Sequence, residues 1–408
     1  MGGGLLQLVA YGAQDVYLSG NPEITFFKFV HRRYTNFAIE HIEQTNLGTV
    51  AFGNRFSVTV SRNGDLIGNV ILEVDMPALD TLAAAKKAGS AEDTDGLTVD
   101  GAGDTAKFGY VPYLGNRLIE DVTIEIGGQK IHGNDYIYSW SADQLEEGDD
   151  EGYKKMIGAD GSVFNANGGT LYIPLKFWFT KHYGNSLPLI ALQYHEVKIN
   201  VTLASFSDLV SGNTGGTVAA KGTPSCRCFV DYIFLDQNER HRFAKHTHEY
   251  LIEEVQSSGS DTFAGCKARH SLQFNHPVKY LMWLVHDNSC GTDKHTWHEF
   301  TAAQTCGLQL NNQDRFAERK GGYFTMVQPW QHWSNIPENT NVHVYSFAIH
   351  PEELQPSGTC NFSRIDSVML HLTMSEEASD SSYITHVYAR SYNVLRVMSG
   401  MGGKAFSS

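Results

Sequence analysis

The sequence has few cysteines and no long apolar run, and each shortage excludes a class of protein. Only 6 of the 408 residues are cysteine, without a repeating spacing, so we expect no disulfide framework and a reducing compartment. The longest apolar run, Tyr280 to Val285, is far shorter than the ~20 residues that span a bilayer. The N-terminus lacks the basic region of a secretory signal, and Leu6 stands where a myristoylation motif needs Ser or Thr.

Basic residues are also scarce. The chain has 31 Lys and Arg against 45 Asp and Glu, a formal net charge of -14, which disfavours binding to DNA because that binding requires cations to neutralise phosphates. Aromatic residues are abundant, with 22 Phe, 19 Tyr and 6 Trp in a chain that is only 19% charged. This composition predicts well-packed cores, and the length allows two or three domains.

Strand patterns dominate the chain. Short alternating or β-branched runs end at Gly, Asn, Asp or Pro, which predicts an all-β protein. The clearest runs are Arg55–Val60, Asn69–Pro77, Asp121–Ile131, His195–Leu203, Phe229–Asp236, His248–Gln256, Tyr280–Val285, Gly307–Phe316, Val342–Ile349, Ser367–Met374 and Tyr388–Met398. Helix is a minor component, and the best candidates are Ser141–Met156 and Asp236–His246.

The two halves of the chain repeat the same order of patterns. Two hairpin signals, centred on Gly127-Gly128 and Asn311-Asn312, are each followed by an aromatic tract. Three pairs of strand segments echo each other in the same order: Val122–Gln129 with Gly307–Gln313, Val197–Val201 with Val368–Leu372, and Asp231–Leu235 with Ser391–Leu395. Two copies of one all-β domain explain this order better than chance does.

Candidate metal ligands are few. His246 and His248, followed by Glu253, have the spacing with which a cupin barrel holds a divalent ion, but the second half of the cupin pattern is missing. Cys226 and Cys228 share one face of a strand without a second ligand pair, so we interpret them as small buried residues.

The sequence shows no phosphate-binding loop and no nucleophile–base pattern. Asn200 and Asn361 begin formal glycosylation sequons, although Asn200 falls within a predicted strand. Two short basic patches, His31–Arg33 and Arg240–Arg242, lie beside aromatic residues and are more typical of a solvated surface or of subunit pairing than of nucleic-acid binding. A chain with many aromatic residues to bury and no catalytic pattern is typical of a protein that assembles with other subunits, because aromatic side chains anchor interfaces.

Several segments are specific enough to identify a family. The chain resembles the major capsid proteins of the nucleocytoplasmic large DNA viruses, the group that includes iridoviruses and the large viruses of algae. The resemblance extends along the whole chain, outside the long loops, and rests on Leu5–Glu40, Leu192–Val201, Asp231–Gln256, Asn275–Trp283, Leu310–Phe324, Phe362–Leu372 and Asn393–Phe406.

The resemblance implies a double jelly roll, that is, two consecutive eight-stranded β-sandwiches with short helices and long surface loops. The implied domains are an N-terminal arm over residues 1–26, a first jelly roll over 27–236 and a second over 237–408. Three chains would form a pseudo-hexagonal capsomer, and capsomers would tile an icosahedral shell. The protein would then be a structural component of the virion, assembled in the host cytoplasm, with no catalytic residues, cofactor or metal.

The resemblance also implies the partners. The arm would contact minor capsid proteins and the inner viral membrane, through residues such as Leu5, Leu6, Tyr11, Asn21, Pro22 and Phe26. Proline should hold Asn21 in an extended conformation at the end of the arm. Three loops, Ala83–Lys107, Gly158–Thr170 and Ser205–Thr223, would lie on the outer face, open to contact with the host surface. Direct contact with nucleic acid is not expected.

Two alternatives remain open from the residues. The first is a bicupin-like metal-dependent enzyme that uses His246, His248 and Glu253. The second is a lectin-like sandwich that binds sugars through exposed aromatic loops, which is compatible with a capsid role.

Overall fold

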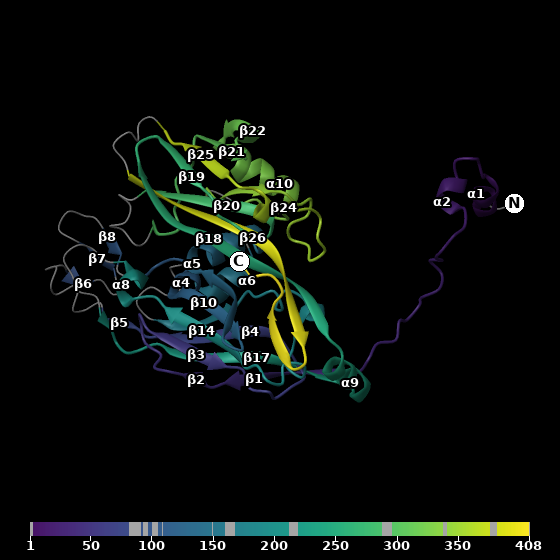
Figure 1. Ribbon diagram of the computed structural model, residues 1–408, viewed down its shortest axis with the longest axis horizontal. Helices are drawn as coiled ribbons and strands as arrows, with labels where there is room; N and C mark the ends of the chain where they lie inside the picture. Colours follow the sequence, from purple (N-terminus) through teal and green to yellow (C-terminus); the bar gives the residue numbers. More distant parts are fainter. Residues whose placement is uncertain are drawn as a thin grey trace. The chain divides into compact units, whose positions relative to one another are not determined.

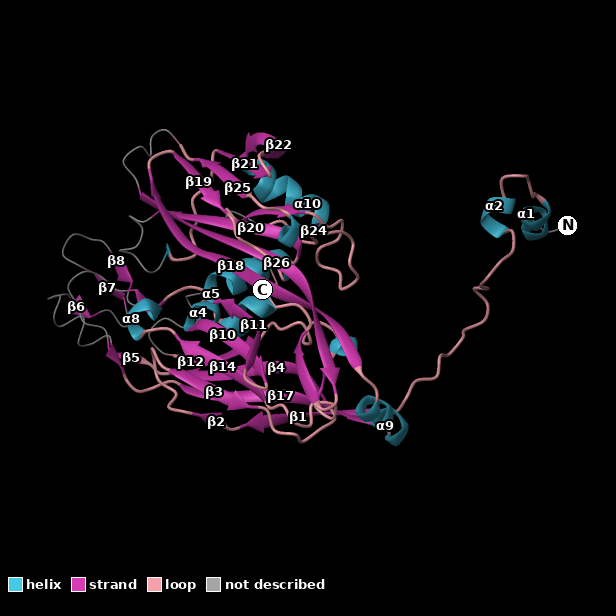
Figure 2. Ribbon diagram, in the orientation of Figure 1, coloured by secondary structure: helices cyan, strands magenta, loops and turns pink. Residues whose placement is uncertain are grey.

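A computed structural model describes residues 3–80, 91–92, 97–99, 105–107, 109–148, 150–159, 168–211, 219–287, 296–337, 341–375 and 382–407. The chain divides into two units, Met1–Asn36 and Phe37–Ser408. The second unit consists mainly of antiparallel strands, with few helices (Figures 1 and 2). The all-β prediction is therefore confirmed.

The first unit contains two short helices, α1 (Gly3–Val9) and α2 (Val16–Ser19), and no buried side chain among its described residues. Asn21 has a φ of 50°, in the left-handed region, so the prediction that Pro22 holds it extended is wrong. Asparagine tolerates this region better than most residues do. The first strand begins only at Phe37, later than the predicted end of the arm at residue 26, and the predicted domain boundaries stay predictions.

The first sandwich consists of two antiparallel sheets. One, called here the β4 sheet, has the order β1 (Phe37–Gln44), β17 (Ser225–Leu235), β4 (Leu66–Met76) and β12 (Gly169–Pro174), and short β13 (Leu187–Pro188) also pairs with β4. The other, the β10 sheet, has the order β11 (Gln129–Asp135), β10 (Ile119–Ile126), β14 (Val197–Leu203), β3 (Arg55–Thr59) and β2 (Asn46–Leu47).

The second sandwich has the same plan. The β20 sheet has the order β18 (His248–Ala264), β26 (Ser382–Met398), β20 (Pro277–Asp287) and β23 (His343–Ser346), extended by β24 (Cys360–Asn361) and β27 (Met401–Lys404). The β21 sheet has the order β19 (Lys267–Ser271), β25 (Val368–Thr373), β21 (Thr305–Leu310) and β22 (Gln313–Lys320). Among the described residues, each sandwich therefore has eight main strands and two short additional ones in these sheets.

Side-chain alternation explains how each sandwich forms its core. Along β4, Leu72 and Val74 are fully buried, whereas Ile71 and Glu73 on the other face are half-buried. This is the pattern of a strand with one face toward the core. The inward faces of the first sandwich form one apolar cluster, and those of the second form another.

The predicted repeat is visible in the topology. β10, β14 and β17 occupy the places in their sheets that β21, β25 and β26 occupy in theirs. Both hairpin turns use positive φ at two successive residues, with 59° and 85° at Gly127-Gly128 and 50° and 62° at Asn311-Asn312. The same backbone turn is thus formed by the two residue types that tolerate it best.

The helical prediction for Asp236–His246 is confirmed by α9 (Gln237–Lys245). The prediction for Ser141–Met156 is wrong in extent, since this stretch belongs to two helices, α5 (Tyr136–Glu146) and α6 (Glu151–Ile157). Asp150 caps α6 by accepting hydrogen bonds from Gly152 N and Tyr153 N, which starts a new helix there. The other helices are α4 (Leu114–Leu118), η1 (Tyr183–Asn185), α8 (Phe206–Leu209), the π-helix η4 (Tyr323–Val327), α10 (Gln328–His332) and η5 (Phe362–Arg364).

The three predicted loops fall partly outside the described residues. Where they are described, they contain short strands: β6 (Ala91–Glu92), β7 (Leu97–Val99) and β8 (Thr105–Lys107) form one small sheet. Two further pairs join β5 (Leu79–Asp80) to β16 (Ala219–Ala220) and β9 (Gly109–Tyr110) to β15 (Val210–Ser211).

Candidate assembly site

Helix α5 of the first sandwich packs against the second sandwich. The face of the β20 sheet that points away from its own core carries Tyr280, Met282 and Leu284. These side chains form one cluster with Ile137 and Trp140 of α5, and Trp140 is only 1% exposed. The amphipathic helix thus buries its apolar side in the other domain, and the two sandwiches share a third core.

Hydrogen bonds at the same junction join polar groups from both sandwiches. The Tyr138 and Tyr280 hydroxyls lie 3.0 Å apart, and Arg390 Nη1 donates to Tyr138 Oη at 3.2 Å. Asp135, the N-cap of α5, accepts from Tyr138 N with one oxygen and from the Tyr388 hydroxyl, at 2.7 Å, with the other. The residue that starts the helix therefore also binds the second sandwich.

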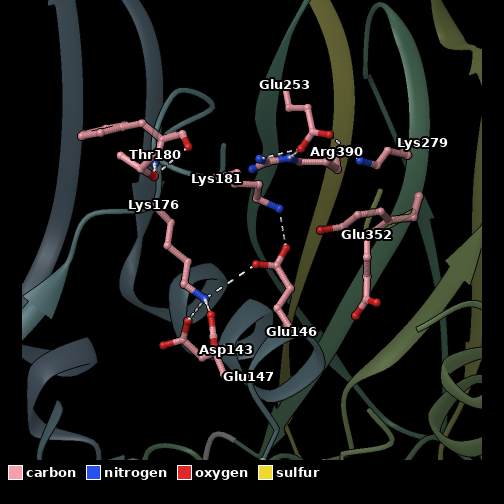
Figure 3. A network of polar contacts seen from close by, with 12 residues as sticks. Asp143, Glu146, Glu147, Lys176, Thr180, Lys181, Glu253, Lys279, Glu352 and Arg390 are labelled. Carbon is pink, nitrogen blue, oxygen red and sulfur yellow. Dashed lines mark hydrogen bonds and ion pairs between the residues drawn. The ribbon is translucent and has the colours of Figure 1, made fainter. Parts of the chain in front are cut away.

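A buried ion pair network lies next to these tyrosines (Figure 3). The Glu253 carboxylate binds Lys279 Nζ with one oxygen and Arg390 with the other, at 2.8 and 2.9 Å for Nη2 and Nε. Burial alone would raise the pKa of Glu253, but Arg390, Lys181 and Lys279 outweigh it and hold the pKa well below its usual range. Lys279 and Arg390 are buried together with Glu253, so each of these charges depends on the others.

The network continues at the end of α5 in the first sandwich. Lys181 donates to Glu146 at 2.7 Å, and Lys176 lies 2.6 Å from Asp143. The two lysines outweigh burial and lower the pKa of Glu146 to about 2. A cavity of about 600 Å³ borders this part, and its lining includes Glu146, Lys176, Lys181 and Glu352. The charged groups present here are mainly engaged with one another.

The structure does not bring the candidate metal ligands together. His248 and Glu253 are an odd number of residues apart on β18 and therefore point to opposite faces. His248 Nε2 lies 2.8 Å from the Phe243 carbonyl oxygen, and the Glu253 carboxylate is occupied by Lys279 and Arg390. Among the residues that the structure describes, no group of three His, Cys, Asp or Glu is arranged to hold a metal.

The interpretation of Cys226 and Cys228 as buried strand residues agrees with the structure. Both lie on the inner face of β17, and burial raises the pKa of the Cys228 thiol to about 12. Of the described cysteines, none forms a disulfide. These thiols are protonated at neutral pH and act as small apolar residues.

The two sequons differ in accessibility. Asn200 on β14 is 6% exposed, its Oδ1 accepts from Ser57, and its Nδ2 donates to Glu125 at 2.8 Å. A glycan does not fit there, so Asn200 is unsuitable as an acceptor. Asn361 is exposed, and its Oδ1 accepts from Ser363 N at the start of η5, so the prediction for Asn361 stays open.

The residues predicted for the arm are exposed. Leu5 and Leu6 on α1 are 57% and 67% exposed, Tyr11 is 58% exposed and Phe26 is 90% exposed. Asn21 and Pro22 are exposed as well. In the described part of the chain, no helix is long and apolar enough to cross a membrane.

Sequence reasoning missed the junction between the sandwiches. Lys279 and Arg390 lie within strands that read as apolar, and a lone charge in such a strand was the available signal. A buried charge requires a partner, which predicts an ion pair but not its identity. Only the fold shows that Glu253 is that partner.

Comparisons with known proteins come from both sequence and structure. Residues 25–236 match the profile described as "Major capsid protein N-terminus", and residues 239–403 match "Large eukaryotic DNA virus major capsid protein". The chain is 42% identical to a major capsid protein of Pyramimonas orientalis virus and 41% identical to one of Paramecium bursaria Chlorella virus 1, with 100% of each chain covered.

Solved structures agree with these matches. The crystal structure of VP54 from PBCV-1 has a TM-score of 0.78 at 35% identity, covering 94% of this chain and all of that one. The Faustovirus major capsid protein has a TM-score of 0.75 at 13% identity, covering 95% and 94%, and this likeness concerns the fold alone. Together with the two sandwiches described above, these matches confirm the double jelly roll.

Proposed function

The chain belongs to the major capsid proteins of large eukaryotic DNA viruses, and from that membership we propose that it forms homotrimers that tile an icosahedral shell. The observation that carries the proposal is the duplicated sandwich. Two similar domains per chain give a ring of three chains six near-equivalent positions, and such a ring packs like a hexagon.

The junction between the sandwiches supports a structural role. A capsomer with a fixed outline requires the two domains to keep one orientation, and the cluster around Trp140 with the Glu253 network provides a buried, specific contact. Buried ionic groups of this kind favour one packing over others, because a shifted packing would leave charges unpaired. We therefore assign these groups to domain orientation and propose that the chain is not an enzyme.

The arm supports a role in contacts below the capsomer. Its exposed apolar residues include Leu5, Leu6, Tyr11 and Phe26, and such surface is normally buried by a partner. We assign minor capsid proteins and the inner viral membrane as those partners, the host cytoplasm as the place of assembly, and the three long loops to the outer face.

Light scattering after size-exclusion chromatography tests the proposal, with electron microscopy of the same fractions. We expect the mass of three chains and particles with three-fold symmetry and a hexagonal outline. A monomer at all concentrations and salt conditions would contradict it.

A further inference from the structure

The contact between the two sandwiches of one chain has two sides. The first sandwich contributes its edge strand β11 and the helix that follows it, α5. The second contributes the outward face of the β20 sheet, including Met282 and Tyr388. One domain's edge and helix thus dock on the other domain's sheet face, which is a head-to-tail contact.

The second sandwich carries its own copy of the edge and helix, and among the described residues part of this copy is exposed. β22 has the place in the β21 sheet that β11 has in the β10 sheet, and the helices η4 and α10 follow it as α5 follows β11. Met326 and Trp330 lie four residues apart and are 64% and 69% exposed, whereas Trp140 of α5 is 1% exposed. Figure 1 shows β22 at the top of the second sandwich, away from α5.

The first sandwich carries its own copy of the sheet face. On the β4 sheet, Ile71 pairs with Phe229, as Met282 pairs with Tyr388 on the β20 sheet. Met282 and Tyr388 are buried under α5, but Ile71 and Phe229 are half-buried and neighbouring Tyr172 is 44% exposed. This outward face is apolar at its centre, where Ile71 also lines the cavity bordered by Glu146 and Glu352, and the short helix η1 contacts its edge through Tyr183 and Asn69.

The exposed edge of the second sandwich and the outward face of the β4 sheet have opposite charge. β22 presents Arg315, Arg319 and Lys320 in an exposed strand, and its two acids, Asp314 and Glu318, are bonded within their own sheet. The outward face of the β4 sheet carries four acidic residues, Glu43, Glu73, Asp75 and Asp231. Two of them have partners on the same face, since Arg227 binds Glu73 and His41 binds Asp231. The excess of acid there suits a basic edge.

We propose that the β22, η4 and α10 surface of one chain docks on the outward face of the β4 sheet of a second copy, as β11 and α5 dock on the β20 sheet within the chain. This assignment rests on the proposed trimer and identifies its interface. The contact is head-to-tail, and with two domains per chain it closes after three chains. Trp330 is the central anchor and inserts near Ile71 and Phe229, since a large exposed aromatic side chain typically dominates such contacts.

A single substitution tests the anchor. Trp330→Asp should convert the trimer to monomers in light scattering, whereas Leu47→Asp, at a residue 54% exposed on β2, should leave the trimer intact. Circular dichroism should show the same fold in both variants because both side chains are exposed. A Trp330→Asp protein that remains trimeric would overturn the inference while leaving the proposed function standing, whereas a monomeric unmodified protein would overturn both.

Cross-linking tests the direction of the contact. Chains with Trp330→Cys and chains with Tyr172→Cys are unfolded together, refolded and oxidised, then separated on a non-reducing gel. We expect a disulfide-linked dimer from the mixture and none from either variant alone or from the unmodified chain. Linked dimers from Trp330→Cys alone would indicate a two-fold contact and contradict the inference, as would the absence of linkage in a mixture that forms trimers.

Discussion

The hydroxyl of Tyr138 in the first sandwich lies 3.0 Å from the hydroxyl of Tyr280 in the second, although 142 residues separate the two in sequence. Arg390 donates to Tyr138 as well, so this pair connects the tyrosines to the Glu253 network. The two domains are therefore joined by specific polar contacts in addition to apolar area.

Glu253→Gln should destabilise the protein strongly. The substitution leaves the buried charges of Lys279 and Arg390 without their carboxylate, and breaking a buried pair typically costs about 3–5 kcal/mol. The matched control is Glu249→Gln on the same strand, where an exposed carboxylate binds Arg396 of β26 at 2.8 Å and the expected loss is about 0–1 kcal/mol. Urea unfolding measures both, and equal losses would contradict the assignment of the network to domain orientation.

Acid should destabilise the protein through buried histidines. Burial, aided by the charge of Arg390, lowers the pKa of His132 to about 3 from an ordinary value of 6.5. Between pH 6.5 and 3 the unfolded chain binds a proton at this residue that the folded chain does not, so stability falls with pH by about 1.4 kcal/mol per unit.

His132→Phe should remove this part of the pH dependence. The ring lies among Phe177 and Trp178, so an aromatic replacement fits the surroundings. Unfolding free energies measured at pH 4, 5, 6 and 7 should then show a shallower slope in the variant. An unchanged slope would mean that His132 takes up its proton in the folded state.

A triple variant in which serine replaces Phe26, Phe27 and Phe29 should leave the folded domains unaffected. These side chains are 82–98% exposed. The thermal unfolding midpoint of the variant should therefore match that of the unmodified chain, while assembly into particles larger than the trimer is lost. Calorimetry and analytical ultracentrifugation measure the two effects, and a lowered midpoint with normal assembly would contradict the role of the arm.

Asn200→Ala should cost about 1–3 kcal/mol, because Ser57 and Glu125 lose a buried hydrogen-bond partner. Peptide mapping by mass spectrometry of protein from infected cells should find Asn200 unmodified. A glycan on Asn200 would contradict the buried position of its amide.

Local patterns predicted most of the strands because each one has a face toward a core. Alternation located β4, β14 and β25, and turn residues located both hairpins. Helix α5 was placed too late because its first turn, Tyr136 to Ser139, reads as aromatic strand. Its helical state is stabilised by Asp135 and by burial against the second sandwich, and neither is visible in a local window.

The candidate site was less predictable for a related reason. The residues that join the domains come from α5, β18, β20 and β26, and their spacing along the chain follows no motif. The metal hypothesis rested on the spacing of His246, His248 and Glu253, and spacing alone does not show that the odd separation of His248 and Glu253 directs them to opposite faces. Only the fold shows which distant strands lie side by side.

Asp135 has a further consequence for how the chain is made. Its carboxylate caps α5 and accepts from Tyr388, which is synthesised 253 residues later. Ile137 and Trp140 of the same helix cover Tyr280 and Met282 of β20, which are also synthesised after the first domain. The first domain spends this interval with the apolar side of α5 exposed, and a first domain made without the second should therefore be prone to aggregate.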